Sequence, residues 1–401
     1  MIRAKVNLDQ LYQYLLIALA FTFPLTVVGG NLIIGIIILL WLFSGNYQVK
    51  LSQIVNNKLS IFSILFFMMH VIGLLWTKDL EWGYLIVNKM WYFLLLLPIL
   101  LTITKKEYIR HYISAFIMAM TLTELLSYLV WFEIIGPLHK ATVGNPTPTM
   151  SHISYNPFLT FGIYLIAHEF LFSKYLTKLF KYAYVFFAIS MSINMFITGG
   201  RAGQVMYFIM LGVLIFQYYG RERKVRAAIV SLIITSSIFL GAYGFSDIFH
   251  SRVNQAVNNI SMYDENRQTS VGQRIAYTIN SLEIIKNNLF FGVGTGDFPS
   301  EYNKVHANNS PEVSTTVNPH NMYILILAQL GLFGLTGMLL IFYQQIKFSL
   351  TAKIKINRDL GLVLPLLFLV IMFSDSYLLG HFTTLLFVFF SSFLYKNFEK
   401  S

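Results

Sequence analysis

The sequence predicts an all-α polytopic membrane protein, and two observations carry that prediction. Of the 401 residues, 56% are hydrophobic and 12% are charged, whereas soluble domains carry about 25% charged residues. Apolar runs of about 17–25 residues, the length that crosses a hydrocarbon core of roughly 30 Å, recur from end to end. Membrane β-barrels instead show alternating segments of about ten residues. We therefore expect a single integral membrane domain over residues 1–401.

Twelve apolar runs are interpreted as transmembrane helices. The first follows Arg3 and Lys5 and lacks a small-residue cleavage site, so we expect a retained helix and not a signal peptide. A long polar stretch at 245–320 separates the ninth run from the tenth. The predicted spans are 10–28, 31–45, 58–76, 85–104, 110–136, 154–172, 182–199, 203–219, 227–244, 321–346, 360–374 and 380–396.

The positions of Lys and Arg predict the orientation of these spans. With the N-terminus in the cytoplasm, most of the 29 Lys and Arg fall in inward segments, as the positive-inside rule requires. Both termini are then cytoplasmic and the large loop 245–320 faces outward. The net charge of +11 is explained by orientation and by contact with anionic membrane lipids, not by nucleic-acid binding.

Several kinds of chemistry are excluded by what the sequence lacks. The chain has no cysteine, so it has no thiolate nucleophile and no Cys-ligated metal. No set of metal-binding side chains is convincing. The phosphate-binding loop that ends in Gly-Lys-Ser/Thr is also absent. We therefore expect no metal and no cofactor.

Arg201 is the first candidate for the site. It lies in the segment 198–203, TGGRAG, in a turn that faces outward between two spans. Its glycines, including Gly200, permit close backbone approach, and the planar guanidinium suits bidentate phosphate binding. The alternative is an arginine that extends from a helix end toward the interface.

Arg274 begins an amphipathic stretch inside the large loop. Five apolar residues with helical spacing follow it and form one apolar stripe, interrupted by Lys286. Such a helix can lie on the membrane surface or over the helical bundle. The alternative for Arg274 is a solvated loop arginine. The stripe consists of Ile275, Ile279, Leu282, Ile285 and Leu289.

The segment 292–298, GVGTGDF, follows this predicted helix. Its glycines predict a tight turn, and the N–H groups of Gly294 and Gly296 are candidates to bind an anion. A simple turn is the alternative. Asp297 is expected to cap a short helix that runs from Phe298 to Asn303.

His320 and Asn321 open the tenth span, after Pro319, which suits a first helical turn. The positive end of the helix dipole disfavours an imidazolium there. A neutral imidazole is then available as a general base. The alternative is an interfacial histidine in contact with headgroups.

Other polar residues near or within the spans are expected to have structural roles. Glu124 falls at mid-membrane depth, where a carboxylate is costly and is usually paired or functional. Structural roles are also expected for Glu133, His152, Asp375 and His381, which lie near the outer helix ends.

Two arginines, a neutral histidine and a position at the outer face suit a lipid-linked diphosphate as substrate. The arginines would stabilise the charge on the leaving diphosphate, and the histidine would take a proton from an acceptor hydroxyl. Arginines in this role make a metal unnecessary.

These motifs, in this order, resemble the O-antigen ligase / O-antigen polymerase superfamily. The resemblance rests on TGGRAG at 198–203, the Arg274 helix with GVGTGDF, PHNMY at 319–323 and GLFG at 331–334, and it covers about 190–335. It implies a GT-C-like glycosyltransferase of the bacterial inner membrane with a periplasmic site. Family ligases transfer a glycan from undecaprenyl diphosphate to lipid A-core, and inversion at the anomeric carbon would follow from direct attack.

The resemblance also implies roles for individual residues. Arg201 and Arg274 match the diphosphate-binding arginines, and His320 matches the proposed base. We expect Gly200, Gly294, Gly296 and Asn321 to contact the substrate as well. The acceptor is lipid A-core in ligases and a protein or a growing glycan in related members.

Three rival functions remain. An O-antigen polymerase shares the donor and often carries an Arg-x10-Gly pattern; Arg201 and Gly212 fit it once, but Gly212 falls within a span and Arg274 pairs with Ile285. A transporter or flippase would show inverted repeats with broken helices near the midplane. A peptidoglycan-type polymerase would need an essential outer-loop aspartate, for which Asp297 is the candidate.

Overall fold

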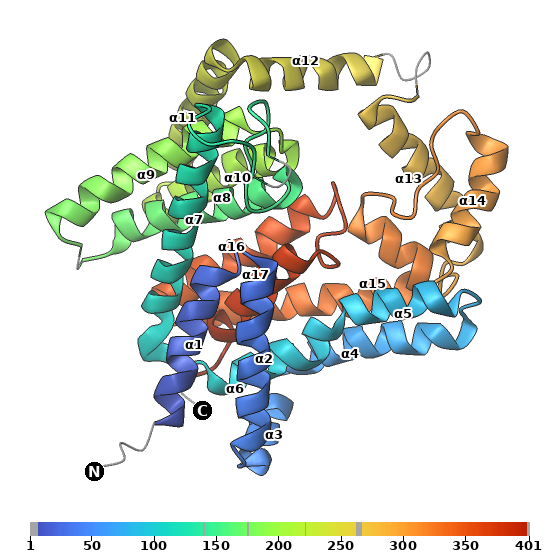
Figure 1. The fold of residues 1–401 in the computed structure, drawn as a ribbon, viewed down its shortest axis with the longest axis horizontal. Coiled ribbons are helices and arrows are strands. Elements are labelled where there is room, and N and C mark those ends of the chain that lie inside the picture. The colour runs from blue at the N-terminus through green and yellow to red at the C-terminus, as the bar shows by residue number, and fades with distance from the viewer. Residues whose placement is uncertain (1–6, 139–140, 175, 221, 262–266, 399–401) are drawn as a thin grey trace. The chain divides into compact units, whose positions relative to one another are not determined.

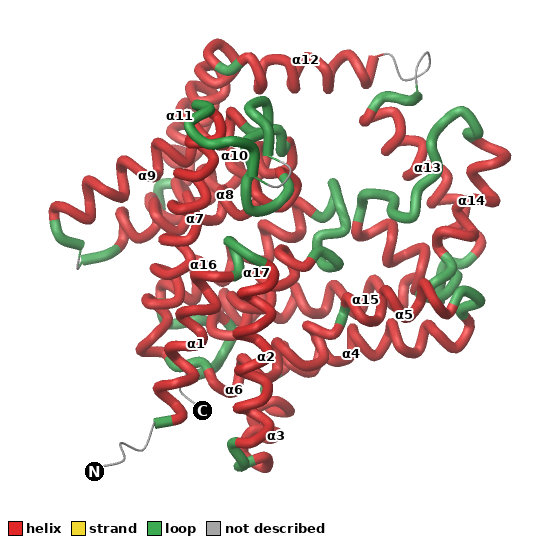
Figure 2. Tube along the Cα trace, viewed as in Figure 1, coloured by secondary structure: helices red, strands yellow, loops and turns green. Residues whose placement is uncertain are grey.

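A computed structural model describes residues 7–138, 141–174, 176–220, 222–261 and 267–398. Within these ranges the chain consists of helices and connecting loops and contains no strand (Figures 1 and 2). It forms two compact units. Unit 1 comprises residues 1–36 and 107–254, and unit 2 comprises residues 37–106 and 255–401.

Unit 1 is built around α8, whose residues from Tyr155 to Ile166 are all buried. Helices α7, α9 and α10 surround it. Gly203 allows the closest approach, since a Cβ there would lie 2.3 Å from the Cβ of Asn156. The helices of unit 1 are α1 (Leu8–Thr22), the start of α2 (Val27–Phe43), α7 (Ile109–Trp131), α8 (His152–Phe172), α9 (Lys178–Ile197), α10 (Arg201–Tyr219), α11 (Lys224–Phe245) and the first part of α12 (Asp247–Ser261).

Unit 2 has its core where α4, α6, α15, α16 and α17 pack together. Figure 1 shows α13 and α14 beside the start of α15. The elements of unit 2 are the end of α2, α3 (Tyr47–Asn56), α4 (Lys58–Ile72), η1 (Gly73–Trp76), α5 (Leu80–Lys89), η2 (Tyr92–Leu96), α6 (Leu97–Ile103), the end of α12, α13 (Ser270–Asn287), α14 (Phe298–Asn309), α15 (Met322–Thr351), α16 (Lys355–Ile371) and α17 (His381–Leu394); η3 (Lys106–Tyr108) lies at the boundary with unit 1.

Seven helices in the described ranges are long and apolar enough to cross a membrane. The number is eight if α2 and α3, bent by 117°, form one broken span. The sequence predicted twelve. Part of the difference arises because α1, α16 and α17 have 15, 17 and 14 residues, whereas a full crossing takes about 20. The polytopic helical class is therefore supported, and the number twelve stays a prediction.

The large loop predicted at 245–320 corresponds to the segment between α11 and α15. Helix α11 ends at Phe245 and α15 begins at Met322. Between them lie α12, α13 and α14, so the loop contains short helices, as expected. Helix α12 was not predicted. The side of the membrane that the loop faces stays a prediction.

Candidate functional site

His320 and Asp375 face each other in unit 2. His320 Nδ1 lies 3.3 Å from Asp375 Oδ2. The two residues meet because the start of α15 is joined to the end of α16, where the N–H of Met322 donates to the carbonyl oxygen of Met372 at 2.9 Å. The His320 side chain is 34% exposed and that of Asp375 is 16% exposed. The imidazole therefore has one ring nitrogen directed at a half-buried carboxylate, while part of the ring remains accessible.

A small hydrogen-bond network holds this pair. Asn318 Nδ2 donates to Asp375 Oδ1 at 3.2 Å, and the backbone N–H of His320 donates to Asn318 Oδ1 at 3.0 Å. Ser376 Oγ donates to the same Asn318 oxygen at 2.8 Å. Asn318 thus ties the backbone that carries His320 to the carboxylate that faces its ring.

The electrostatics of the pair favour an ionised carboxylate. Burial raises the pKa of Asp375, but four lowering contributions together outweigh burial and bring the pKa below the usual value, and the largest of them are the hydrogen bond and charge of His320. The backbone N–H of Ser376 and the positive charge of Arg274 lower the pKa of Asp375 further. Arg274 therefore acts electrostatically on the same pair. Tyr277, three residues along α13, stacks against His320 with ring centroids 6.1 Å apart.

His320 does not belong to the helix that it was expected to open. Helix α15 begins at Met322, and the Asn321 side chain caps it by accepting from the N–H groups of Tyr323 and Ile324. His320 instead adopts a left-handed conformation with φ of 53°. Pro319 precedes the helix and is not part of its first turn. Because Asn321 Oδ1 is used as the cap, the expected substrate contact of Asn321 stays a prediction.

The apolar stripe predicted on α13 is only partly correct. The buried residues on this helix include Tyr277, Asn280 and Ile284, which pack against α14 and α15. Two residues of the predicted stripe, Ile279 and Leu282, are exposed, whereas Ile285 is buried. The covered face also carries buried polar residues: Asn280 Nδ2 donates to Ser310 Oγ, and Ser281 Oγ donates to the carbonyl of Tyr277. Arg274 is exposed near the start of this helix.

The glycine-rich segment 292–296 packs against a break in α15. Gly331 has φ of 63° and ψ of −158°, which are not helical, so α15 consists of two helical segments, 322–330 and 332–351. The free N–H groups of Leu332 and Phe333 donate to the carbonyls of Leu289 and Phe290 at 2.8 and 3.1 Å. Backbone groups released by the break are thus satisfied by the two residues that shortly precede this segment, as burial requires.

The N–H groups of Gly294 and Gly296 are hydrogen-bonded to other parts of the protein and do not form an open anion-binding site. The N–H of Gly294 donates to the carbonyl of Gln329 at 3.0 Å, and that of Gly296 to Thr77 Oγ1 at 3.4 Å. A Cβ at Gly296 would lie 2.1 Å from the carbonyl oxygen of Asp79. The turn interpretation is therefore supported for both glycines, and their contact with substrate stays a prediction without support from this geometry.

Asp297 stands at the N-terminal cap of α14, as predicted, but its side chain makes no cap for that helix. Its carboxylate instead accepts from the backbone N–H groups of Lys78 and Asp79, at 2.9 and 2.8 Å. Asp297 is 2% exposed. It anchors the turn between α4 and α5, and helix α14 extends to Asn309, beyond the predicted end.

The turn that carries Arg201 lies in unit 1 and is held by buried amides. Asn156 accepts from Thr198 Oγ1 at 2.8 Å and donates to the carbonyl of Gly200 at 3.1 Å. The N–H of Gly199 donates to Asn145 Oδ1 at 3.1 Å. A Cβ at Gly200 would lie 2.6 Å from a backbone oxygen of α8. The glycines are therefore required by close packing, and Arg201 begins α10 directly after them.

A second arginine lies over the same turn. Arg252 of α12 places Nη2 about 3.4 Å from the position that a Cβ on Gly199 would occupy. Arg252 was not among the predicted site residues, because α12 was not predicted. Unit 1 thus brings two guanidinium-bearing residues to one glycine turn.

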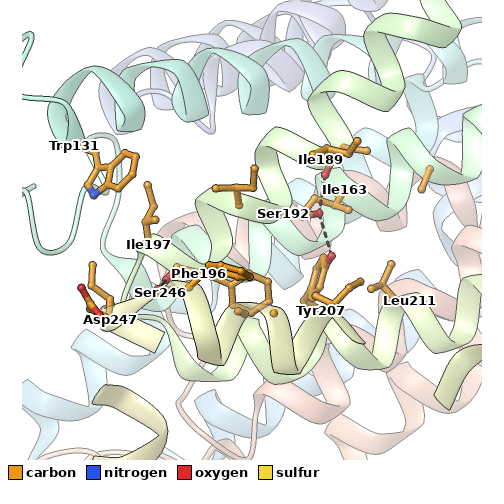
Figure 3. Close-up of a pocket in the computed structure, with 18 residues that line it drawn as sticks. Trp131, Ile163, Ile189, Ser192, Phe196, Ile197, Tyr207, Leu211, Ser246 and Asp247 are labelled. Carbon is orange, nitrogen blue, oxygen red and sulfur yellow. Dashed lines mark hydrogen bonds between the residues drawn. The ribbon is translucent and has the colours of Figure 1, made fainter. Parts of the chain in front are cut away.

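Unit 1 also contains a cavity of about 700 Å³ among α7 to α12. Figure 3 shows Phe196, Ile197 and Leu211 in its lining, with the hydrogen bond from Tyr207 to Ser192 as one of its few polar features. An apolar lining of this kind suits a hydrocarbon chain. A glycan would leave its hydroxyl groups without hydrogen-bond partners there.

The family model described as O-Antigen ligase matches residues 186–339 of the chain. The match supports the O-antigen ligase superfamily for this chain. No curated protein matches it. The matched region of the O-antigen ligase domain runs from α9 into the second segment of α15, and it includes Arg201, Arg274 and His320.

Asp375 is the residue of the candidate site that the sequence did not reveal. It lies outside the matched O-antigen ligase region and was expected to be structural. Its one signal in the sequence is its place between the last two apolar runs, on the same predicted side as His320. His152 contacts Asn145 in unit 1, and His381 contacts Tyr92 in unit 2.

Proposed function

We propose that this protein is a membrane glycosyltransferase that transfers a glycan from undecaprenyl diphosphate to an acceptor hydroxyl. Lipid A-core is the proposed acceptor, as in O-antigen ligases. The match to the O-antigen ligase family suggests ligase- or polymerase-type glycosyltransferase activity. The observation that carries the proposal is the pairing of His320 with Asp375, beside Arg274, at the start of α15.

In the proposed reaction, His320 is the general base. Asp375 faces Nδ1 and favours the tautomer with its proton there, which leaves Nε2 free to accept a proton. As the acceptor oxygen forms its bond to the anomeric carbon, its proton passes to Nε2. The bond between the anomeric carbon and the phosphate oxygen breaks, and its electron pair leaves with undecaprenyl diphosphate. Direct attack inverts the anomeric centre, and Asp375 stabilises the imidazolium that forms.

The arginines have the complementary role in this proposal. Arg274 would stabilise the negative charge that develops on the leaving diphosphate. For Arg201 the support is its sequence context and its place after a tightly packed glycine turn, and a planar guanidinium suits phosphate oxygens. With arginines in this role the reaction is proposed to be independent of metal, so a chelator should leave the activity of purified protein unchanged. Strong inhibition by a chelator would refute that part.

The proposed location is the bacterial inner membrane, with both termini in the cytoplasm and the site at the periplasmic face. Support comes from the distribution of Lys and Arg and from the seven apolar helices. Membrane lipids surround the protein in this proposal, and nucleic acid has no role.

An O-antigen polymerase is the alternative, because it would use the same donor and the same residues on a growing glycan. A transporter or flippase is the weaker alternative, since the His320–Asp375 pair suits proton transfer at an outer helix end. The glycolipids of a strain that lacks this protein distinguish the functions. Loss of a ligase leaves long lipid-linked chains, loss of a polymerase leaves single repeat units, and loss of a flippase leaves units on the cytoplasmic side.

Complementation of that strain tests the residues. Arg201→Ala, Arg274→Ala and His320→Ala should each abolish glycan attachment while the protein still inserts. The matched control is Arg267→Ala, which removes an exposed arginine paired with Glu312 at 3.3 Å and should restore attachment. Normal glycan attachment in all three variants would refute the assignment of these residues to the site.

A further inference from the structure

Helix α13 has two opposite faces, and only one of them is covered within unit 2. Tyr277, Asn280 and Ile284 face α14 and α15. On the other face, Ile279 and Leu282 are 51% and 52% exposed. Helical spacing places Ile275 and Lys286 in line with them. We define the stripe from here on as Ile275, Ile279, Leu282 and Lys286; Ile275 is half-buried, and the other three residues are exposed.

The stripe continues into the chain that follows α13. Leu289, Phe290 and Phe291 are all exposed, Phe290 by 67%. These three residues lie where α15 is broken, because Leu332 and Phe333 donate their N–H groups to the carbonyls of Leu289 and Phe290.

The segment of α15 that follows this break is long enough by itself to cross a membrane. The segment 332–351 rises about 30 Å, the thickness of a hydrocarbon core. The ring of Phe291 contacts Trp76, at the end of the apolar span Lys58–Trp76, with centroids 6.2 Å apart. Tryptophan is enriched at membrane interfaces. The exposed apolar residues of the stripe are thus continuous with the ends of two apolar spans.

We propose that α13 lies in the membrane interface, with its stripe in contact with the bilayer. The partner is the lipid surface itself. Ile279 and Leu282 enter the boundary between headgroups and acyl chains, as in interfacial amphipathic helices. Lys286 lies within the stripe, and its aliphatic stem can cross the apolar layer while its ammonium group reaches lipid phosphates.

The proposal gives α13 a function in placing Arg274. Arg274 precedes Ile275 and so lies on the flank of the stripe. A helix held at the interface keeps this guanidinium at the level of the phosphate groups of membrane lipids. This consequence rests on the proposed function, whereas the contact of the stripe with the bilayer does not.

The absence of cysteine makes a direct test possible, since single cysteines can be labelled without background. Nitroxide labels are placed at Leu282→Cys and Phe290→Cys in full-length protein in lipid nanodiscs. Their collision rates with oxygen, which concentrates in lipid, and with a water-soluble nickel chelate are compared. Controls are Glu283→Cys on the flank of α13 and Lys304→Cys on α14, which packs on the opposite, buried side of α13.

The expected result is an oxygen-to-nickel ratio several-fold higher at positions 282 and 290 than at 304, with 283 in between. Equal ratios at 282 and 304 would overturn the proposal. Ile279→Cys serves if Leu282→Cys does not fold. The experiment does not measure glycan transfer. The contact of the stripe with the bilayer can therefore be refuted while the proposed function stands, and the proposed function can be refuted while the contact stands.

Discussion

Replacement of Asp375 by Asn is the most informative single change. The variant keeps the size of the side chain but removes the charge that faces His320 Nδ1 at 3.3 Å. If His320 becomes an imidazolium during transfer, the carboxylate stabilises the transition state more than the ground state. The loss should therefore appear in kcat and not in KM for the donor.

The magnitude follows from the geometry of the pair. Hydrogen bonds to charged groups contribute about 1.5–3 kcal/mol. The distance is long and the imidazole is 34% exposed, so the lower part of this range applies. About 1.5–2 kcal/mol corresponds to a decrease in kcat of roughly 10- to 30-fold.

The assay is steady-state glycan transfer by purified protein in nanodiscs. The matched control is Asp359→Asn near the start of α16, which loses an ion pair with Lys355 at 2.7 Å but does not contact His320. The control should keep the kcat of the unmodified protein. If Asp375→Asn does so as well, Asp375 does not assist a base and the reasoning is refuted.

Three further predictions concern the parts that hold these residues. Asn156→Leu should lower the stability of the protein by about 1–3 kcal/mol, because it removes two buried hydrogen bonds, one to the carbonyl of Gly200 and one from Thr198 Oγ1. The carbonyl of Gly200 then keeps only the N–H of Gln204 as a donor. Thermal unfolding measures the change, and no change would show that the turn does not need Asn156. Gly292→Ala should lower the free energy of unfolding by about 2 kcal/mol or more, because φ at Gly292 is 67° and a Cβ would lie 2.3 Å from the backbone of Gln329. The control Gly35→Ala has open space around its Cβ and should leave the free energy of unfolding unchanged. The lowered pKa of Asp375 means that the interactions of its carboxylate stabilise the folded state above the ordinary value of 3.8 and are lost as the pH falls through the lower folded-state pKa. The difference in Tm between the unmodified protein and Asp375→Asn should therefore be present at pH 7 and shrink below pH 3.8, and a difference that persists there would contradict this.

The helical class could be predicted because hydropathy determines which segments can be buried in lipid. The C-terminal end of α11 and the N-terminal end of α15 lie near the expected residues for the same reason. The break in α15 could not be predicted in this way. Gly331 lies in an apolar run that looks continuous in the sequence. The N–H groups freed by the break bond to the carbonyls of Leu289 and Phe290, which lie over forty residues earlier in the chain.

Residues of the candidate site could be predicted from the sequence only where the neighbouring residues indicate their chemistry. Arg274 and His320 meet that condition. Asp375 did not, because an aspartate between two spans has no local signature and its partner is 55 residues away. Asp297 shows the converse: its position at a helix start was correct, but its carboxylate bonds to the turn between α4 and α5, which local spacing cannot indicate.

The most direct test of the account is turnover of a lipid-diphosphate-linked glycan by purified protein with and without His320. Release of the lipid diphosphate and glycosylation of the acceptor are measured together for the unmodified protein, for His320→Ala, and for His306→Ala on α14 as the control. The account predicts that His320→Ala loses activity by about 100-fold or more, while His306→Ala retains it. Full activity of His320→Ala would contradict the account.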